Sequence, residues 1–250
     1  MAHVGDLAAN AGEAAHTLSL SNPEAFWRDA ASLIDWVTPP QRIFDDSAAP
    51  LYRWYVGGQL NTCANALDRH VVAGRGDRVA LIHDSAYTGD VTTLTYAELL
   101  DRVSRFAGAL RRQGVERGDR VIIYLPMVPE ALIAMLACAR LGAVHSVVFG
   151  GFAAPELAAR IDDALPKAII TASCGIEGGR VVPYKPLVDE ARHLATHKAR
   201  ACIVMQRPQL EADMGESDIE WGDALAGAEP IDPVVVEATD PLYILYTSGT

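Results

Sequence analysis

The chain has 250 residues, of which 50% are hydrophobic, so it is long enough to bury a substantial core in one large domain or two small ones. Its 32 acidic and 21 basic side chains give a formal net charge of −11 at pH 7. This charge argues against a nucleic-acid-binding or anionic-membrane-binding protein, because both kinds of partner require a basic surface.

The first 20 residues are rich in alanine and polar side chains, and we expect this segment to be loose. It has neither the basic start and apolar core of a secretory signal peptide nor the arginine-rich composition of a transit peptide. No apolar run approaches the ~20 residues that a membrane-spanning helix needs. We therefore expect a cytoplasmic protein.

Aromatic side chains are concentrated between residues 26 and 55, which contain three of the four tryptophans. This density fits a ligand cage, or a strap whose rings hold an extended segment against a domain surface, and we favour the strap. A short helix is expected over 61–70. We predict that residues 1–75 form an N-terminal extension and residues 76–250 an α/β subdomain. The aromatic residues of the stretch are Phe26, Trp27, Trp36, Phe44, Tyr52, Trp54 and Tyr55.

Residues 79–114 predict a β-hairpin followed by a capped helix. The hairpin strands are expected over 79–83 and 91–94. Thr95 and Glu98 have the spacing of a capping box, which opens a helix, and Gly114 marks its end. Apolar side chains at helical spacing predict the buried stripe of this helix. These are Leu99, Val103, Phe106 and Leu110.

The middle of the chain alternates short apolar strands with single helices. Strands of this kind are buried on both faces, and crossover helices join them into a parallel sheet. The predicted fold class is therefore α/β, a parallel sheet with helices on both faces. The expected strands are 121–125, 144–149, 168–172 and 201–205, and the expected helices are 129–142, 155–164 and 187–197.

Residues 206–240 carry much of the negative charge, with ten acidic side chains against Arg207 alone. We interpret this stretch as a solvated connecting loop. A last strand is expected over 242–246. The four cysteines match no zinc pattern, and Cys138 and Cys202 lie in apolar stretches, which favours buried free thiols in a reducing compartment.

Three segments follow predicted strands at the edge where parallel sheets bind ligands. The tail Thr247-Ser248-Gly249-Thr250 can present hydroxyl and N–H groups to phosphate, although such residues also form plain turns. Phe149-Gly150-Gly151-Phe152 allows close approach of a ligand or a tight turn. Segment 173–180 is expected to be a glycine-rich loop with one arginine. This arginine is suited to contact phosphate, or it is simply solvated. His145 has no assignable triad partners, and neither a metal site nor a catalytic residue is predicted.

Taken together, these segments resemble the AMP-forming acyl-CoA synthetases of the adenylate-forming superfamily, and within it the short-chain branch of acetyl- and propionyl-CoA synthetases. The resemblance runs from about Trp54 to Thr250. It is carried by the segments 60–70 (LNTCANALDRH), 118–121 (GDRV), 124–127 (YLPM), 143–152 (AVHSVVFGGF) and 246–250 (YTSGT).

The resemblance implies which residues bind the substrates. It assigns Gly151, Glu177, Gly178, Gly179 and Arg180 to the CoA-binding surface. It assigns Thr247, Ser248, Gly249 and Thr250 to the loop that binds the ATP phosphates. Segment 172–186 is similar to propionyl-CoA synthetases, because the acetate branch carries an arginine where this chain has Glu177.

The implied reaction has two steps. A carboxylate attacks the α-phosphorus of MgATP and forms an acyl-adenylate and pyrophosphate, and the thiol of CoA then displaces AMP. A carboxylate is already ionised at pH 7, so alignment and charge neutralisation matter more than base catalysis. The family's catalytic lysine and acyl pocket would lie beyond Thr250, so we expect an N-terminal fragment with little or no ligase activity.

Other interpretations stay open. One alternative within the short-chain acyl-CoA synthetases is an acetyl-CoA synthetase. Outside it, the chain would be a non-catalytic α/β module that binds CoA or a nucleotide, or an interaction protein. For a fragment, we also expect an exposed apolar surface and self-association.

Overall fold

The structure is a computed structural model and describes residues 4–150 and 152–247. Contacts between residues divide the chain into two compact units. One unit runs to Leu60 and includes Val235–Asp240, and the other comprises Asn61–Val234 with the segment that begins at Pro241. The boundary near residue 75 stays a prediction about domain organisation.

The first unit begins with two helices, α1 (Val4–Ser21) and α2 (Pro23–Ala31). The expectation that residues 1–20 are loose is therefore wrong for the described part of this segment, because alanine has the highest helix propensity of the amino acids. Asn22 separates the helices and caps α2, since its Oδ1 accepts a hydrogen bond of 3.2 Å from the N–H of Ala25. The strands of this unit are β1 (Arg42–Asp45), β2 (Arg53–Val56), β3 (Gln59–Leu60) and β13 (Val236–Glu237).

The aromatic rings of this unit pack against one another. Trp54 lies between Trp27 and Phe44, with ring centroids 5.6 and 4.6 Å away. Phe44 also stacks on Tyr52 at 5.4 Å. Edge-to-face and offset contacts of this kind stabilise a small unit beyond the area that they bury.

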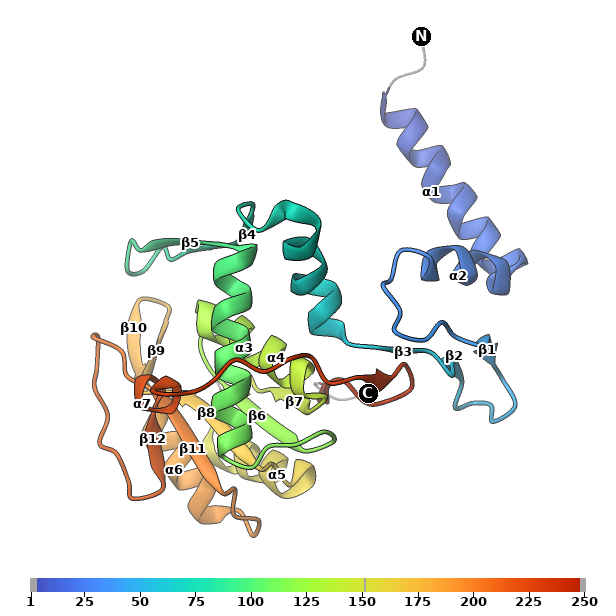
Figure 1. Cartoon of the computed structure of the whole chain (residues 1–250). Helices are drawn as coiled ribbons and strands as arrows, with labels where there is room; N and C mark the ends of the chain where they lie inside the picture. The colour runs from blue at the N-terminus through green and yellow to red at the C-terminus, as the bar shows by residue number, and fades with distance from the viewer. Residues whose placement is uncertain (1–3, 151, 248–250) are drawn as a thin grey trace. The chain divides into compact units, whose positions relative to one another are not determined.

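The second unit is built on a parallel sheet of five strands in the order β12-β11-β8-β6-β7 (Figure 1). Helices cover both faces, so the predicted fold class is confirmed. The strands are β6 (Arg120–Tyr124), β7 (Val144–Val147), β8 (Ala168–Ala172), β11 (Ala201–Met205) and β12 (Asp218–Glu220). The helices are α3 (Tyr96–Arg112), α4 (Pro129–Leu141), α5 (Ala154–Ala164), α6 (Tyr184–Leu194) and α7 (Trp221–Leu225).

Strand β6 shows how the sheet forms two cores. Val121 and Ile123 pack with α3 and α4 on one face, and Ile122 and Tyr124 pack with α5 and α6 on the other. All four side chains are fully buried. The division follows from the alternation of side chains along a strand, and it explains why β6 has no polar side chain after Arg120 other than the hydroxyl of Tyr124.

Several helix ends lie close to the predicted positions. The capping box is confirmed: the N–H of Glu98 donates to Thr95 Oγ1 at 3.2 Å, and the N–H of Thr95 donates to Glu98 Oε2 at 2.8 Å. Helix α4 begins at Pro129, and Gly142 follows its last residue in the left-handed region with φ of 69°. The hairpin is confirmed as β4 (Val79–Asp84) and β5 (Val91–Thr95).

Other elements differ from the expectation. The helix predicted over 61–70 continues to Arg75 and contains π-type turns at Ala64–Asp68 and Val71–Arg75. Helix α6 begins and ends three residues earlier than predicted, because proline is tolerated in the first turn of a helix and Ala195 is extended. The prediction of a regular strand over 242–246 is wrong. This segment makes only one parallel bridge, between Tyr243 and His145. In it, the N–H of His145 donates to the carbonyl of Leu242, and the N–H of Ile244 donates to the carbonyl of His145.

The glycine-rich segment after β8 is a hairpin rather than a loop. Strand β9 (Cys174–Glu177) pairs with β10 (Arg180–Pro183) in antiparallel register. Gly178 and Gly179 form the two-residue turn, with φ of 54° and 78°. Two positive φ values are what a tight hairpin turn requires, so the glycines serve the turn directly.

Candidate functional site

Tyr124 holds the turn that follows β7. It is the last residue of β6, and its hydroxyl donates to the carbonyl oxygens of Gly150 at 2.8 Å and Phe152 at 2.9 Å. Burial raises the pKa of Tyr124 to about 12, and the nearby charge of Glu177 adds to this. The phenol therefore stays a protonated donor at neutral pH. We call residues 149–152 the glycine turn; its Gly151 lies outside the described residues.

Tyr184 joins the glycine turn to the β9–β10 hairpin. It is the first residue of α6 and only 2% exposed. A Cβ atom at Gly150 would lie 1.9 Å from the Tyr184 hydroxyl, and one at Gly175 would lie 2.4 Å from Tyr184 Cζ. Glycine at both positions therefore lets two backbone segments close onto one ring.

The hairpin presents the candidate CoA-binding residues. Tyr184 donates a hydrogen bond of 2.7 Å to Glu177 Oε1, and burial together with this carboxylate raises the pKa of Tyr184. Gly178, Gly179 and Arg180 at the hairpin tip are exposed. The structure thus brings Glu177 and the described part of the glycine turn together around Tyr184, and Arg180 is exposed at the hairpin tip.

Helix α5 holds the segment that leads to the candidate phosphate loop. The guanidinium of Arg160 lies over two rings, 4.3 Å from the centroid of Phe152 and 5.1 Å from that of Tyr246. The Tyr246 hydroxyl donates to Asp163 Oδ2 at 2.6 Å. Burial, together with this carboxylate, raises the pKa of Tyr246 to about 12. Thr247 comes next and is exposed, whereas Ser248, Gly249 and Thr250 lie outside the described residues.

His145 lies under this segment at the edge of the sheet. Its ring is 5.9 Å from that of Tyr243, and its Nδ1 is buried without a hydrogen-bond partner among the described residues. Burial lowers the pKa of His145 to about 4. The imidazole is therefore neutral at physiological pH, and a proton on it would have no acceptor at Nδ1.

This shift predicts a loss of stability in mild acid. Because the folded pKa of about 4 lies below the unfolded value of 6.5, the unfolded chain binds more protons between these pH values. We expect the free energy of unfolding to fall by about 2 kcal/mol from pH 7 to pH 5 through His145. Urea denaturation at each pH measures it.

His145→Gln removes the titrating group, so its stability should depend less on pH by the same amount. The same substitution at the exposed His16 is the control for the change of residue. An unaltered pH dependence in His145→Gln would contradict the assignment.

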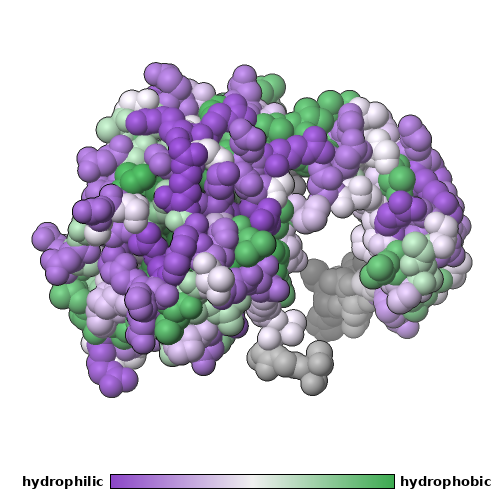
Figure 2. Space-filling model, turned by 90° about the horizontal axis from the view of Figure 1, so that it is seen from below, coloured by the Kyte–Doolittle hydropathy of each residue, from purple (hydrophilic) through white to green (hydrophobic). Residues whose placement is uncertain are grey.

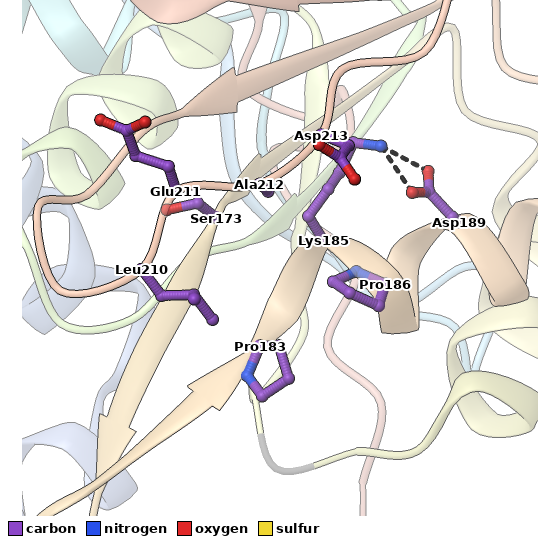
Figure 3. Close-up of a pocket in the computed structure, with 9 residues that line it drawn as sticks. All are labelled: Ser173, Pro183, Lys185, Pro186, Asp189, Leu210, Glu211, Ala212 and Asp213. Atoms are coloured by element: carbon purple, nitrogen blue, oxygen red, sulfur yellow. Dashed lines mark hydrogen bonds and ion pairs between the residues drawn. The ribbon is translucent and has the colours of Figure 1, made fainter.

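A pocket of about 460 Å³ lies beside β10 and the start of α6 (Figure 3). Lys185 lines it with a side chain that is 2% exposed and pairs with Asp189 at 2.6 Å and Asp218 at 2.7 Å. Glu211 and Asp213 line it from the connecting segment. Asp218 is 1% exposed, so the expectation that 206–240 is only a solvated loop is wrong: this stretch contains β12, α7 and a buried ion pair.

The four cysteines are free and buried, which confirms the prediction for Cys138 and Cys202. Burial raises the pKa of each of these two thiols to about 12, so both stay protonated and unreactive. Within residues 4–150 and 152–247, no group of three or more His, Cys, Asp or Glu side chains is arranged to hold a metal ion. No helix in the same ranges has both the length and the apolar character of a membrane span.

Residues 67–250 match the family model described as AMP-binding enzyme. The chain belongs to this family. Residues 13–66 match a second model, acetyl-coenzyme A synthetase N-terminus. The predicted resemblance to AMP-forming acyl-CoA synthetases is therefore confirmed. The second match fits the predicted short-chain branch, because acetyl-CoA synthetases belong to that branch.

Relatives of the chain carry names from the same group of enzymes. The human mitochondrial acyl-CoA synthetase short-chain family member 3 is 47% identical over 93% of the chain. The acetyl-coenzyme A synthetase of Pasteurella multocida is 48% identical over 90%. Acetoacetyl-CoA synthetase from Streptomyces lividans superimposes over 94% of the chain with a TM-score of 0.83 and 30% identity. The chain spans 34%, 35% and 36% of these proteins, respectively.

Tyr124, Tyr184 and Arg160 were not among the site residues predicted from sequence. Tyr124 could have been noticed, because it is the one hydroxyl-bearing side chain in an otherwise apolar run and ends a strand on the ligand-binding edge. Arg160 carries no such signal, since it lies in an ordinary helical pattern, and Tyr184 lies outside the predicted strands and helices. Their roles depend on which distant segments they meet.

Proposed function

We propose that the chain is the N-terminal part of an ATP-dependent short-chain acyl-CoA synthetase that activates propionate as acyl-AMP and transfers the acyl group to CoA. The observation that carries this proposal is the convergence of the glycine turn and the β9–β10 hairpin on Tyr184 in a chain of the AMP-binding family. The convergence lies where parallel α/β sheets bind their ligands, outside the carboxyl ends of the strands.

In this proposal the hairpin and the glycine turn bind CoA. Gly151, Gly178 and Gly179 would let the nucleotide approach the backbone, and the exposed Arg180 would contribute positive charge. Glu177 occupies the position where the acetate branch carries an arginine, and its carboxylate is engaged by Tyr184. This difference is the basis for favouring propionate.

The segment Thr247-Ser248-Gly249-Thr250 would bind the phosphates of ATP. Hydroxyl and N–H groups suit this task because they offer donors to crowded phosphate oxygens. Mg²⁺ would arrive bound to the ATP phosphates, because in such sites it is usually held by substrate phosphates, waters and one or two carboxylates. We assign no catalytic residue to this chain, and we expect little or no ligase activity from it alone.

Two alternatives have support of their own. Acetate as the substrate is favoured by the match of residues 13–66 to the N-terminus of acetyl-coenzyme A synthetase. The second alternative is a non-catalytic module that binds CoA or a nucleotide. It is supported by the second unit, in which a hydrophobic core buries each face of the sheet. The cytoplasmic location stays a prediction.

Self-association also stays a prediction. Met127, Phe149 and Leu245 are 90%, 69% and 70% exposed. On the face seen in Figure 2, however, apolar side chains form small separate groups among hydrophilic ones.

Calorimetry of the chain with CoA tests the proposed binding site. We expect weak binding that Arg180→Ala reduces by at least about tenfold, because a charge-assisted hydrogen bond contributes on the order of 1.5–3 kcal/mol. Arg111→Ala, at an exposed arginine of α3, is the matched control and should bind CoA unchanged. Equal binding by Arg180→Ala and the unmodified chain would refute the assignment of Arg180.

The same titrations separate the alternatives. Tight binding of CoA or ATP by the chain alone would favour the self-contained module. Propionate-dependent pyrophosphate exchange by the chain alone would contradict the expectation of little or no activity.

A further inference from the structure

Helix α5 contacts a residue next to each of the two candidate sites in the sequence. Phe152 ends the glycine turn of the candidate CoA site, and Tyr246 immediately precedes the candidate phosphate loop. Arg160 lies over both rings, and Asp163 accepts the Tyr246 hydroxyl. Four residues from two parts of the chain, 152–163 and 246, therefore form one contact group, which we call the α5 bridge.

The Phe152 end of the α5 bridge is also held by a residue outside the bridge, and Arg160 is held against its own helix. The carbonyl of Phe152 accepts a hydrogen bond from the buried Tyr124. Arg160 Nη1 donates to the carbonyl of Glu156 at 2.7 Å, which holds the guanidinium against its own helix. Tyr246 is held at its ring face and at its hydroxyl. A guanidinium between two aromatic faces gains from both, because each ring presents negative charge to the cation.

We propose that Arg160 and Asp163 are positioning residues that fasten the segment entering the phosphate loop to the turn of the CoA site. Through this bridge, a ligand that binds the glycine turn also restrains residues 242–247. The identity of the two ligands, CoA and ATP, rests on the proposed function; the fastening itself does not.

The neighbouring carboxylate supplies a matched control. Asp162 is also exposed on α5, but it accepts hydrogen bonds from the N–H groups of Thr196 and His197, at 3.1 and 2.7 Å. Asp162→Asn and Asp163→Asn therefore make the same chemical change one residue apart. Only the second removes the charge that binds Tyr246.

Hydrogen–deuterium exchange of the ligand-free chain tests the fastening. We expect peptide 242–247 to exchange roughly three- to tenfold faster in Arg160→Met and in Asp163→Asn than in the unmodified chain. Arg160→Lys, which keeps the cation, should restore part of the protection, and Asp162→Asn should leave the peptide unchanged. Peptides of α3 and α4 should be unaffected in every variant. Unchanged exchange of 242–247 in both Arg160→Met and Asp163→Asn would overturn the proposal.

A second measurement with saturating CoA tests the transmission. In the unmodified chain CoA should slow exchange of both the glycine-turn peptide and peptide 242–247; in Arg160→Met it should slow only the former. An equal response of 242–247 in Arg160→Met would overturn the link. If CoA slows exchange of neither peptide in the unmodified chain, the proposed CoA site is wrong. The exchange of the ligand-free variants then still tests whether Arg160 and Asp163 hold residues 242–247.

Discussion

Alanine in place of Gly175 is expected to lower the free energy of unfolding by about 2–4 kcal/mol. The added methyl group would lie 2.4 Å from Cζ of Tyr184, closer than carbon atoms can approach. Tyr184 is 2% exposed and packs 5.0 Å from the ring of Tyr124, so it has no open space into which to move. The hairpin would have to separate from α6, and CoA binding should be lost with it.

Urea denaturation measures the change in stability, and calorimetry measures the loss of CoA binding. Gly12→Ala is the control, because no atom lies within 4 Å of a Cβ at Gly12, in helix α1. It should be neutral or slightly stabilising. Combined with Tyr184→Ala, Gly175→Ala should cost less than the sum of the two single changes. Additive costs would show that the two residues do not compete for the same space.

Lys185→Met is expected to destabilise the second unit by about 3 kcal/mol, because it removes a cation from the buried Asp218. Burial acts against the charge of Lys185, but hydrogen bonds from its ammonium to Asp189 and Asp218 outweigh this and raise its pKa. After the substitution Asp218, 1% exposed, keeps Arg192 at 2.8 Å as its remaining cation. This second partner limits the loss.

Thermal or urea unfolding monitored by circular dichroism gives the magnitude. Lys198→Met is the matched control. Lys198 is exposed just after α6, and its ammonium donates to carbonyl groups at the end of that helix, those of Arg192 and Ala195. Loss of these bonds should cost about 0.5–1 kcal/mol. Adding Asp218→Asn to Lys185→Met should recover part of the stability, since the buried carboxylate, which Arg192 alone then neutralises, is removed. Equal effects of Lys185→Met and Lys198→Met would show that the buried pair contributes little.

Much of the fold could be predicted because its signals are local. Thr95 and Glu98 determine where α3 begins through bonds within four residues, and Gly142 ends α4 through its own backbone conformation. Apolar runs such as 121–124 predict buried parallel strands because both faces of such a strand must avoid water. Segment 173–180 was misjudged, since a glycine pair serves a loop and a hairpin turn equally well until its pairing partner is known.

The sequence by itself determined the alternation of strands and helices, the sheet edge on which we propose that ligands bind, and the resemblance that points to an acyl-CoA synthetase. Only the tertiary structure decided that Tyr184 joins Gly150 to Gly175 and Glu177, and that Arg160 joins Phe152 to Tyr246. The reason is physical: periodicity and capping depend on neighbours three or four residues away, which the sequence lists directly. Contacts such as Tyr184–Gly150 and Arg160–Tyr246, which join residues 34 and 86 positions apart, depend on how every intervening element packs.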